Sequence, residues 1–295
     1  MNKNNTLGVI LAGGIGSRLY PLSSIGSKHF LPIYDKPMIF YPISVLMLAG
    51  IKDFVLVTQK KNIPIYKKIL QNISKLGVTF KFKIQNKPLG IAHALKIASK
   101  GTRKDIALIL GDNIFFGHGF NIILKNLMEF KSQGQLVVHT VKNPENLGVL
   151  TYDQKGFPKK IIEKPKKFIG SDAVVGLYFY KNKSLKFLNK LKPSKRKELE
   201  ITDFNNILIK KKLISYQRLG RGFAWLDTGS PSKLIEASNF VEILEKRQGF
   251  KIACLEEIAL TQNFITTKKY NKIVNKMPNS DYKNYLIKIA KVLND

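Results

Sequence analysis

A glycine-rich turn near residue 13 carries the residue types in this sequence that are best suited to phosphate chemistry. The apolar run from Leu7 to Leu11 indicates a short buried strand, and three glycines (Gly13, Gly14 and Gly16), Ser17 and Arg18 come soon after it. Glycines let backbone N–H groups approach a bulky ligand and point at one spot, and the planar fork of Arg18 suits phosphate oxygens. Lys28 shares the same loop and offers a second cation to the same phosphates.

The spacing of this turn differs from that of two common phosphate loops. A Walker loop needs a following Gly-Lys-Ser/Thr, which is missing here, and the dinucleotide fingerprint needs Gly-x-Gly-x-x-Gly, whereas this turn is Gly-Gly-x-Gly. From this stretch alone, a tight strand-to-helix connection remains the alternative to a phosphate-binding loop.

Two carboxylates stand where strands are expected to end. Asp112 follows the apolar run Asp105 to Leu110, and Asp227 follows Trp225-Leu226. Mg²⁺ keeps several waters and takes one or two carboxylates together with substrate phosphates, so this pair could hold Mg²⁺. For Asp112 a helix cap is the alternative. Glu163-Lys164-Pro165 ends another expected strand and offers a further cation.

Composition narrows the class of protein. The chain has 295 residues, 44% of them hydrophobic, which is enough for one large core. No apolar run approaches the ~20 residues of a membrane helix, and the start of the chain has no signal-peptide pattern, so we expect a cytoplasmic protein without a membrane partner. Its single cysteine, Cys254, excludes an internal disulfide.

The net charge of +30 raises the possibility of a polyanionic partner. Only six of the 50 basic residues are arginines, and the lysines are scattered along the chain, whereas base readout depends on arginine forks. We therefore expect most of this charge to be solvated surface, with no specific nucleic-acid partner.

The pattern of the first half predicts strands alternating with helices. Expected strands are 7–11, 53–58, 78–85 and 105–110, and expected helices are 35–49 (capped by Asp35 and closed by Gly50), 64–76 and 91–100. Such alternation is typical of a doubly wound, mostly parallel sheet with ligands beyond the carboxyl ends of its strands.

The second half has shorter strands and then helices. Expected strands at 136–141, 148–152, 160–162 and 174–180 suggest antiparallel additions beside the cleft, and helices are expected at 202–212 and from Ser230-Pro231 to about 246. After Gly249 we expect mixed strand and helix, ending in a helix over 280–293. We divide the chain into a core (1–240) and a mostly helical extension packed on it (241–295).

Several long motifs, in order, resemble those of the sugar-phosphate nucleotidyltransferases. They cover nearly the whole chain: Leu11-Ala12-Gly13-Gly14-Ile15-Gly16-Ser17-Arg18, Lys28, Tyr34-Asp35-Lys36-Pro37, Gly111-Asp112-Asn113, Glu163-Lys164-Pro165, Glu198-Leu199-Glu200-Ile201-Thr202-Asp203 and Trp225-Leu226-Asp227-Thr228-Gly229. The resemblance implies a Rossmann-like fold and a homotetramer. It also implies that the substrates are dTTP and glucose 1-phosphate. In that reaction a sugar-phosphate oxygen attacks the α-phosphorus, and pyrophosphate leaves.

The resemblance also implies roles for residues of this chain. Arg18 and Lys28 would hold the triphosphate, Asp112 and Asp227 would bind Mg²⁺, and Lys164 would contact the sugar phosphate. The remaining positions are Leu11, Gly13, Gly14, Gly16, Ser17, Gln85 and Gly90 for the nucleotide, and Leu147, Gly148, Glu163 and Val174 for the sugar.

Three positions depart from the family pattern. Leu147 replaces a tyrosine beside the sugar pocket, Leu89 replaces an aspartate, and His29 replaces a glutamine after the first catalytic lysine. Because of Leu147, the exact hexose stays open. Within the same enzyme class, use of UTP in place of dTTP is a further alternative. A non-catalytic sugar-nucleotide sensor and a polyanion-binding protein are the alternatives from other functional classes.

Overall fold

A single nine-stranded sheet forms the centre of the computed structural model, which describes residues 5–292. The strands are β1 (Thr6–Leu11), β2 (Pro32–Ile33), β3 (Lys36–Pro37), β4 (Asp53–Thr58), β5 (Thr79–Ile84), β6 (Asp105–Leu110), β7 (Asn113–Phe116), β8 (Gly134–Thr140), β9 (Gly148–Tyr152), β10 (Pro158–Glu163), β11 (Asp172–Tyr180), β12 (Ile214–Arg218) and β13 (Ala224–Asp227). The order in the nine-stranded sheet is β10-β9-β11-β6-β1-β4-β5, with β8 paired to β11 and β12 paired to β8. Strands β2 and β3 form a separate two-stranded sheet, and so do β7 and β13.

Within residues 5–292, α1, α2, α3, α5, α6 and α9 overlap expected helices, whereas α4, α7 and α8 were not predicted. The α-helices are α1 (Phe40–Leu48), α2 (Ile63–Ile73), α3 (Ile91–Ser99), α4 (Phe120–Met128), α5 (Ile201–Lys210), α6 (Pro231–Gln248), α7 (Leu255–Thr261), α8 (Thr267–Asn275) and α9 (Asp281–Val292). Short 3₁₀ turns are η2 (Ser17–Leu19), η3 (Leu22–Ile25), η4 (Lys28–Phe30), η5 (Lys60–Asn62), η6 (Ser74–Leu76), η7 (Pro144–Asn146) and η8 (Asn182–Lys190).

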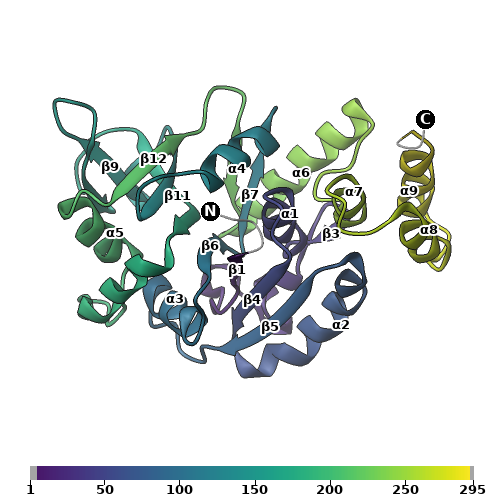
Figure 1. Ribbon diagram of the computed structural model, residues 1–295, viewed down its shortest axis with the longest axis horizontal. Helices are drawn as coiled ribbons and strands as arrows, with labels where there is room; N and C mark the ends of the chain where they lie inside the picture. The colour runs from purple at the N-terminus through teal and green to yellow at the C-terminus, as the bar shows by residue number, and fades with distance from the viewer. Residues whose placement is uncertain (1–4, 293–295) are drawn as a thin grey trace.

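The sheet is mixed and covered on both faces, as the sequence predicted. Strands β6, β1, β4 and β5 are parallel, whereas β11 runs antiparallel to β6 and to β8. Alternate residues of β1 pack into different cores: Ile10 faces α1, α2 and the carboxyl-terminal helices, and Val9 faces α3 and α5. Strand β9 pairs antiparallel with β10 and β11, whereas β12 pairs parallel with β8. Both strands lie with α5 at one end of the molecule, and α8 and α9 lie at the other (Figure 1).

Two local predictions were wrong. Asp35 does not cap a helix: α1 begins at Phe40, and the Asp35 carboxylate instead pairs with Lys36 and Lys251. The segment after Gly249 is not mixed strand and helix, because α7, α8 and α9 form its regular structure as far as residue 292. The expected end of the last helix, Leu293, lies outside the described residues.

Two further features bear on the organisation of the chain. Helix α6 runs from Pro231 to Gln248, across the proposed division at residue 240, and α7 to α9 contribute to the same core as α1 and α2. The division into core and extension stays a prediction. Among residues 5–292, every helix is too short or too polar to cross a membrane.

Candidate active site

A cavity of about 360 Å³ lies beyond the carboxyl ends of β1 and β6, where the parallel sheet meets its antiparallel additions. Residues predicted for the nucleotide or for the metal ion line it: Leu11, Arg18, Gln85, Gly90, Asp112 and Asp227. Residues predicted for the sugar line it as well: Leu147, Gly148, Glu163 and Val174. One cavity therefore brings together groups that are more than 200 positions apart in the chain.

The other predicted residues lie outside the lining of this cavity: Gly13, Gly14, Gly16, Ser17, Lys28 and Lys164. Gly14 and Ser17 line a neighbouring cavity of about 630 Å³, together with Lys61. Lys28 reaches the first cavity indirectly, because its ammonium group donates to Oδ2 of Asp112. The glycine-rich turn thus runs between two cavities, as a loop that follows an extended phosphate chain would.

The two aspartates meet because β7 and β13 pair in an antiparallel ribbon. Asp227 stands opposite Asn113, which directly follows Asp112. The backbone N–H and hydroxyl of Thr228 both donate to the Asp112 carbonyl, at 3.1 and 3.0 Å. The pairing of β7 with β13 was not predicted from the sequence. Asp227, at the end of β13, and Asp112, directly before β7, were both predicted as metal ligands.

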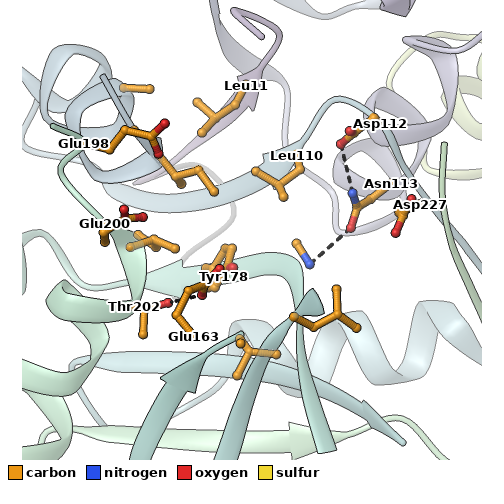
Figure 2. Close-up of a pocket in the computed structure, with 18 of the residues that line it drawn as sticks. Leu11, Leu110, Asp112, Asn113, Glu163, Tyr178, Glu198, Glu200, Thr202 and Asp227 are labelled. Carbon is orange, nitrogen blue, oxygen red and sulfur yellow. Dashed lines mark hydrogen bonds between the residues drawn. The ribbon is translucent and has the colours of Figure 1, made fainter. Parts of the chain in front are cut away.

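Carboxylates gather on two sides of the cavity. Figure 2 shows Asp112 and Asp227 on one side, and Glu163, Glu198 and Glu200 on the other. Glu163 Oε2 accepts a hydrogen bond from the Thr202 hydroxyl at 2.8 Å, which fixes its orientation. One side can take a metal with phosphates, and the other offers acceptors for hydroxyl groups.

Asp112 and its partner Lys28 are both partly buried. Burial opposes ionisation of this carboxyl, but the positive charge of Lys28 and the hydrogen bonds from Lys28 and Asn113 lower its pKa to about 2. The neighbouring His29 is buried, and burial together with Lys28 lowers its pKa to about 3, so its imidazole is neutral at pH 7. His29 Nδ1 lies 2.7 Å from the Ser27 hydroxyl, which explains how a histidine is held in place of the family's glutamine.

The wall predicted to contact the base depends on Gly90. This glycine has a φ of +100°, and a Cβ atom there would lie 2.3 Å from the Leu199 carbonyl oxygen, so a side chain does not fit. Gln85 donates from Nε2 to the Gly90 carbonyl at 3.2 Å, which ties the two predicted nucleotide residues together. Leu89, the second departure, is joined by its carbonyl to Leu199 N–H at 2.8 Å.

The backbone beside the wall predicted to contact the sugar turns at Lys164. Its φ of +47° is a conformation that side-chain-bearing residues rarely adopt, and its N–H donates to the Leu147 carbonyl at 2.9 Å. This hydrogen bond fixes the backbone of Leu147, the residue that replaces the family's tyrosine.

Three charged residues that line the cavity had no role predicted from the sequence: Arg196, Glu198 and Glu200. Arg196 donates from Nη2 to both carboxylate oxygens of Glu200 at 3.0 Å. Arg196 lies between Lys195 and Lys197, so nothing in the sequence distinguishes it from the surface lysines around it. Glu198 and Glu200 fall within a quoted family motif, and their alternation in an extended segment was the available signal.

The donor set fits one divalent cation. Asp112 and Asp227 line the same cavity, and each carboxylate already accepts from a lysine ammonium group, so the site favours positive charge at both places. Residues 5–292 contain no cluster of three or more His, Cys, Asp or Glu side chains that could hold a metal by themselves. Two carboxylates completed by substrate phosphates are the arrangement that Mg²⁺ prefers.

The chain belongs to the nucleotidyl transferase family, whose model matches residues 7–243. A glucose-1-phosphate thymidylyltransferase of Neisseria meningitidis is 42% identical over 96% of this chain and 99% of that protein. The Mycolicibacterium smegmatis protein of the same name is 40% identical over 96% of this chain and 98% of its own length.

Solved structures support the same fold. A Bacillus anthracis protein in complex with sucrose has a TM-score of 0.73 and 34% identity, over 80% of this chain and 94% of that one. A UDP-glucose pyrophosphorylase with bound UDP-glucose has a TM-score of 0.70 at 24% identity, over 81% of this chain and 98% of that one, which bears on the fold alone.

Replacing Lys28 should raise the pKa of Asp112. Without the Lys28 charge, burial is left as the main influence, and burial favours the neutral acid. In Lys28→Met we expect the Asp112 carboxyl to titrate about 1–3 pH units higher than in the wild type, measured by ¹³C NMR of labelled aspartate. Lys104→Met, which removes a lysine paired with Asp53, is the control. If Asp112 in Lys28→Met titrates as in the wild type, Lys28 does not hold it ionised.

Proposed function

We propose that this chain transfers the thymidylyl group of dTTP to glucose 1-phosphate, giving dTDP-glucose and pyrophosphate. The observation that carries the proposal is the single cavity in which Arg18, Asp112 and Asp227 face Glu163 and Gly148. Family membership supports nucleotidyl transfer, and the names of the relatives at about 40% identity support these two substrates.

The reaction needs positioning and charge neutralisation more than a covalent nucleophile. A phosphate oxygen of the sugar phosphate forms a bond to the α-phosphorus, and the bond from that phosphorus to the β-phosphate oxygen breaks. Arg18 and Lys28 would neutralise the leaving pyrophosphate, and Lys164 would hold the attacking phosphate in line. Mg²⁺, held by Asp112 and Asp227, would supply positive charge at the α-phosphate.

The remaining residues would bind the two substrates. Gln85 and Gly90 would contact the base, with Leu11, Gly13, Gly14, Gly16 and Ser17 along the rest of the nucleotide. Gly148 and Val174 would shape the sugar pocket, and Glu163 would accept hydrogen bonds from sugar hydroxyls. The family resemblance further supports a homotetramer acting in the cytoplasm, with dTDP-glucose consumed in carbohydrate synthesis such as that of dTDP-rhamnose.

The direct test is pyrophosphate release across a small matrix of substrates. We expect release with dTTP and glucose 1-phosphate in the presence of Mg²⁺ and loss of release with excess EDTA. UTP and other hexose 1-phosphates complete the matrix and test the alternatives within the family. Binding of sugar nucleotide without turnover would favour a sensor, and tight salt-dependent nucleic-acid binding without turnover would favour a polyanion-binding protein.

The shared-ion model predicts non-additive losses at the two aspartates. Asp112→Asn and Asp227→Asn each remove one anionic ligand, and each should lower kcat by about 10²-fold or more. The double variant should lose much less than the product of the two, because the residues act through one ion. Far-ultraviolet circular dichroism checks that the fold survives. Fully multiplicative losses would mean that the carboxylates serve separate tasks.

The missing tyrosine at Leu147 predicts a looser choice of sugar. Leu147 lines the cavity but has no hydroxyl group, and one buried hydrogen bond changes discrimination by ~1–3 kcal/mol, about ten- to hundredfold. Glucosamine or galactose 1-phosphate should therefore be turned over measurably. Leu147→Tyr should raise the ratio of kcat/KM for glucose over galactose 1-phosphate and leave the KM for dTTP unchanged. An unchanged ratio would mean that residue 147 only packs.

A further inference from the structure

A lysine on helix α6 forms an ion pair with one of the two proposed metal ligands. Lys233 lies in the first turn of α6 and donates from Nζ to Asp227 Oδ2 at 2.6 Å. The other oxygen of this carboxylate, Oδ1, accepts from Gly229 N–H at 3.2 Å. The Lys233 side chain is 46% exposed, and that of Asp227 is 20% exposed.

Asp112 is held in the same manner. Its Oδ2 accepts from Lys28, and its Oδ1 accepts from Asn113 Nδ2 at 3.0 Å. All four carboxylate oxygens of the proposed metal site therefore receive hydrogen bonds from the protein itself. Two of the donors are ammonium groups, which carry the kind of charge that a metal ion would bring.

The two lysines differ in their surroundings. Lys28 is 12% exposed and lies in the phosphate-binding loop. When Asp112 binds a metal ion, the Lys28 ammonium group can pair with substrate phosphates instead. Lys233 projects from a surface helix and lies outside the lining of the cavity. A lysine is a flexible and strongly hydrated point charge, and such a group can leave Asp227 for solvent.

We propose that Lys233 is a displaceable counter-ion of Asp227, and that it sets the concentration of Mg²⁺ the site requires. The proposal rests on the proposed function, because it assigns the metal to Asp112 and Asp227. For a metal to coordinate Asp227 Oδ2 directly, the ammonium group of Lys233 must leave. Lys233 is thus a positioning residue: it keeps the carboxylate neutralised and oriented while no metal is bound.

The expected effect is small because the pair is partly exposed. Exposed ion pairs of this kind contribute up to about 1 kcal/mol, which corresponds to about fivefold in an equilibrium constant. Removing the ammonium group should therefore tighten metal binding about two- to fivefold. Salt screens exposed charges, so the difference should shrink as the KCl concentration rises.

Lys233→Gln tests the proposal, and Lys246→Gln is its matched control. Lys246 lies on the same helix, pairs with Glu242 at the same distance of 2.6 Å, and lies outside the cavity lining. Both variants lower the net charge of the whole chain equally, so only a local effect separates them. Lys233→Arg keeps the charge and should keep the wild-type metal affinity.

Metal binding is measured in two ways on the full-length protein. Electron paramagnetic resonance follows Mn²⁺ binding, first with Mn²⁺ alone and then with dTTP but no sugar phosphate. Pyrophosphate release gives the Mg²⁺ concentration at half-maximal rate. In Lys233→Gln we expect the dissociation constant for Mn²⁺ and the Mg²⁺ concentration at half-maximal rate each to be about two- to fivefold lower than in the wild type. Both quantities should match the wild type in Lys246→Gln.

Two results would overturn the proposal, and a third would separate it from the proposed function. Equal metal affinities in Lys233→Gln and wild type would leave the ion pair without a role at the metal. A higher KM for dTTP at unchanged metal affinity would make Lys233 a phosphate ligand instead. If the wild type releases no pyrophosphate but Lys233→Gln still binds Mn²⁺ more tightly, the proposed function fails and the counter-ion role stands.

Discussion

The pairing of β7 with β13 is the constraint on which the candidate site depends. It joins segments 114 positions apart in register, Asn113 opposite Asp227, and so sets the distance between the two carboxylates that could share a metal. Asn113 fastens the ribbon to the main sheet, because its Oδ1 accepts from Trp225 Nε1 at 2.7 Å and from Gly176 N–H at 3.2 Å. A shift of one residue in this register would turn Asp227 to the opposite face of the ribbon.

Charge balance is the second constraint. Asp112 sits at the end of a buried strand, where an uncompensated carboxylate would be costly, and Lys28 and the amide of Asn113 keep it ionised. His29 lies beneath them as a neutral imidazole, and so adds no third charge. The structure thus keeps this carboxyl ionised in a place where burial alone would raise its pKa.

The sequence predicted the parts of this fold that have a strong periodic signal. Strands β1, β4 and β6 are apolar runs that end in turn residues, and they were located within one residue. The ribbon was missed because β7 and β13 have four residues each and mix polar with aromatic side chains, which gives neither period a clear signal. The failed cap at Asp35 has a tertiary cause: two lysines, one of them from position 251, compete for its carboxylate.

The same limit applies to the site. Asp112, Asp227 and Glu163 could be recognised because each follows an expected strand, and a family motif supports each of them. Lys28 neutralises Asp112, which lies more than 80 positions away in the chain. Lys233 neutralises Asp227 because helix α6 begins where its first turn brings the two side chains together. Residue types and local spacing do not encode such pairings, so the carboxylate that each lysine neutralises is known only from the structure.

Helix α6 extends this charge balance to the carboxyl-terminal helices. Its first turn carries Lys233, and near its other end the buried Glu245 accepts from Lys36 at 3.0 Å and from Lys251 at 3.0 Å. Lys36 is 3% exposed, so it needs this carboxylate, and Lys251 comes from the segment that leads into α7. The orientation of α6, and with it the approach of Lys233 to Asp227, therefore depends on a buried ion network that the core alone does not complete.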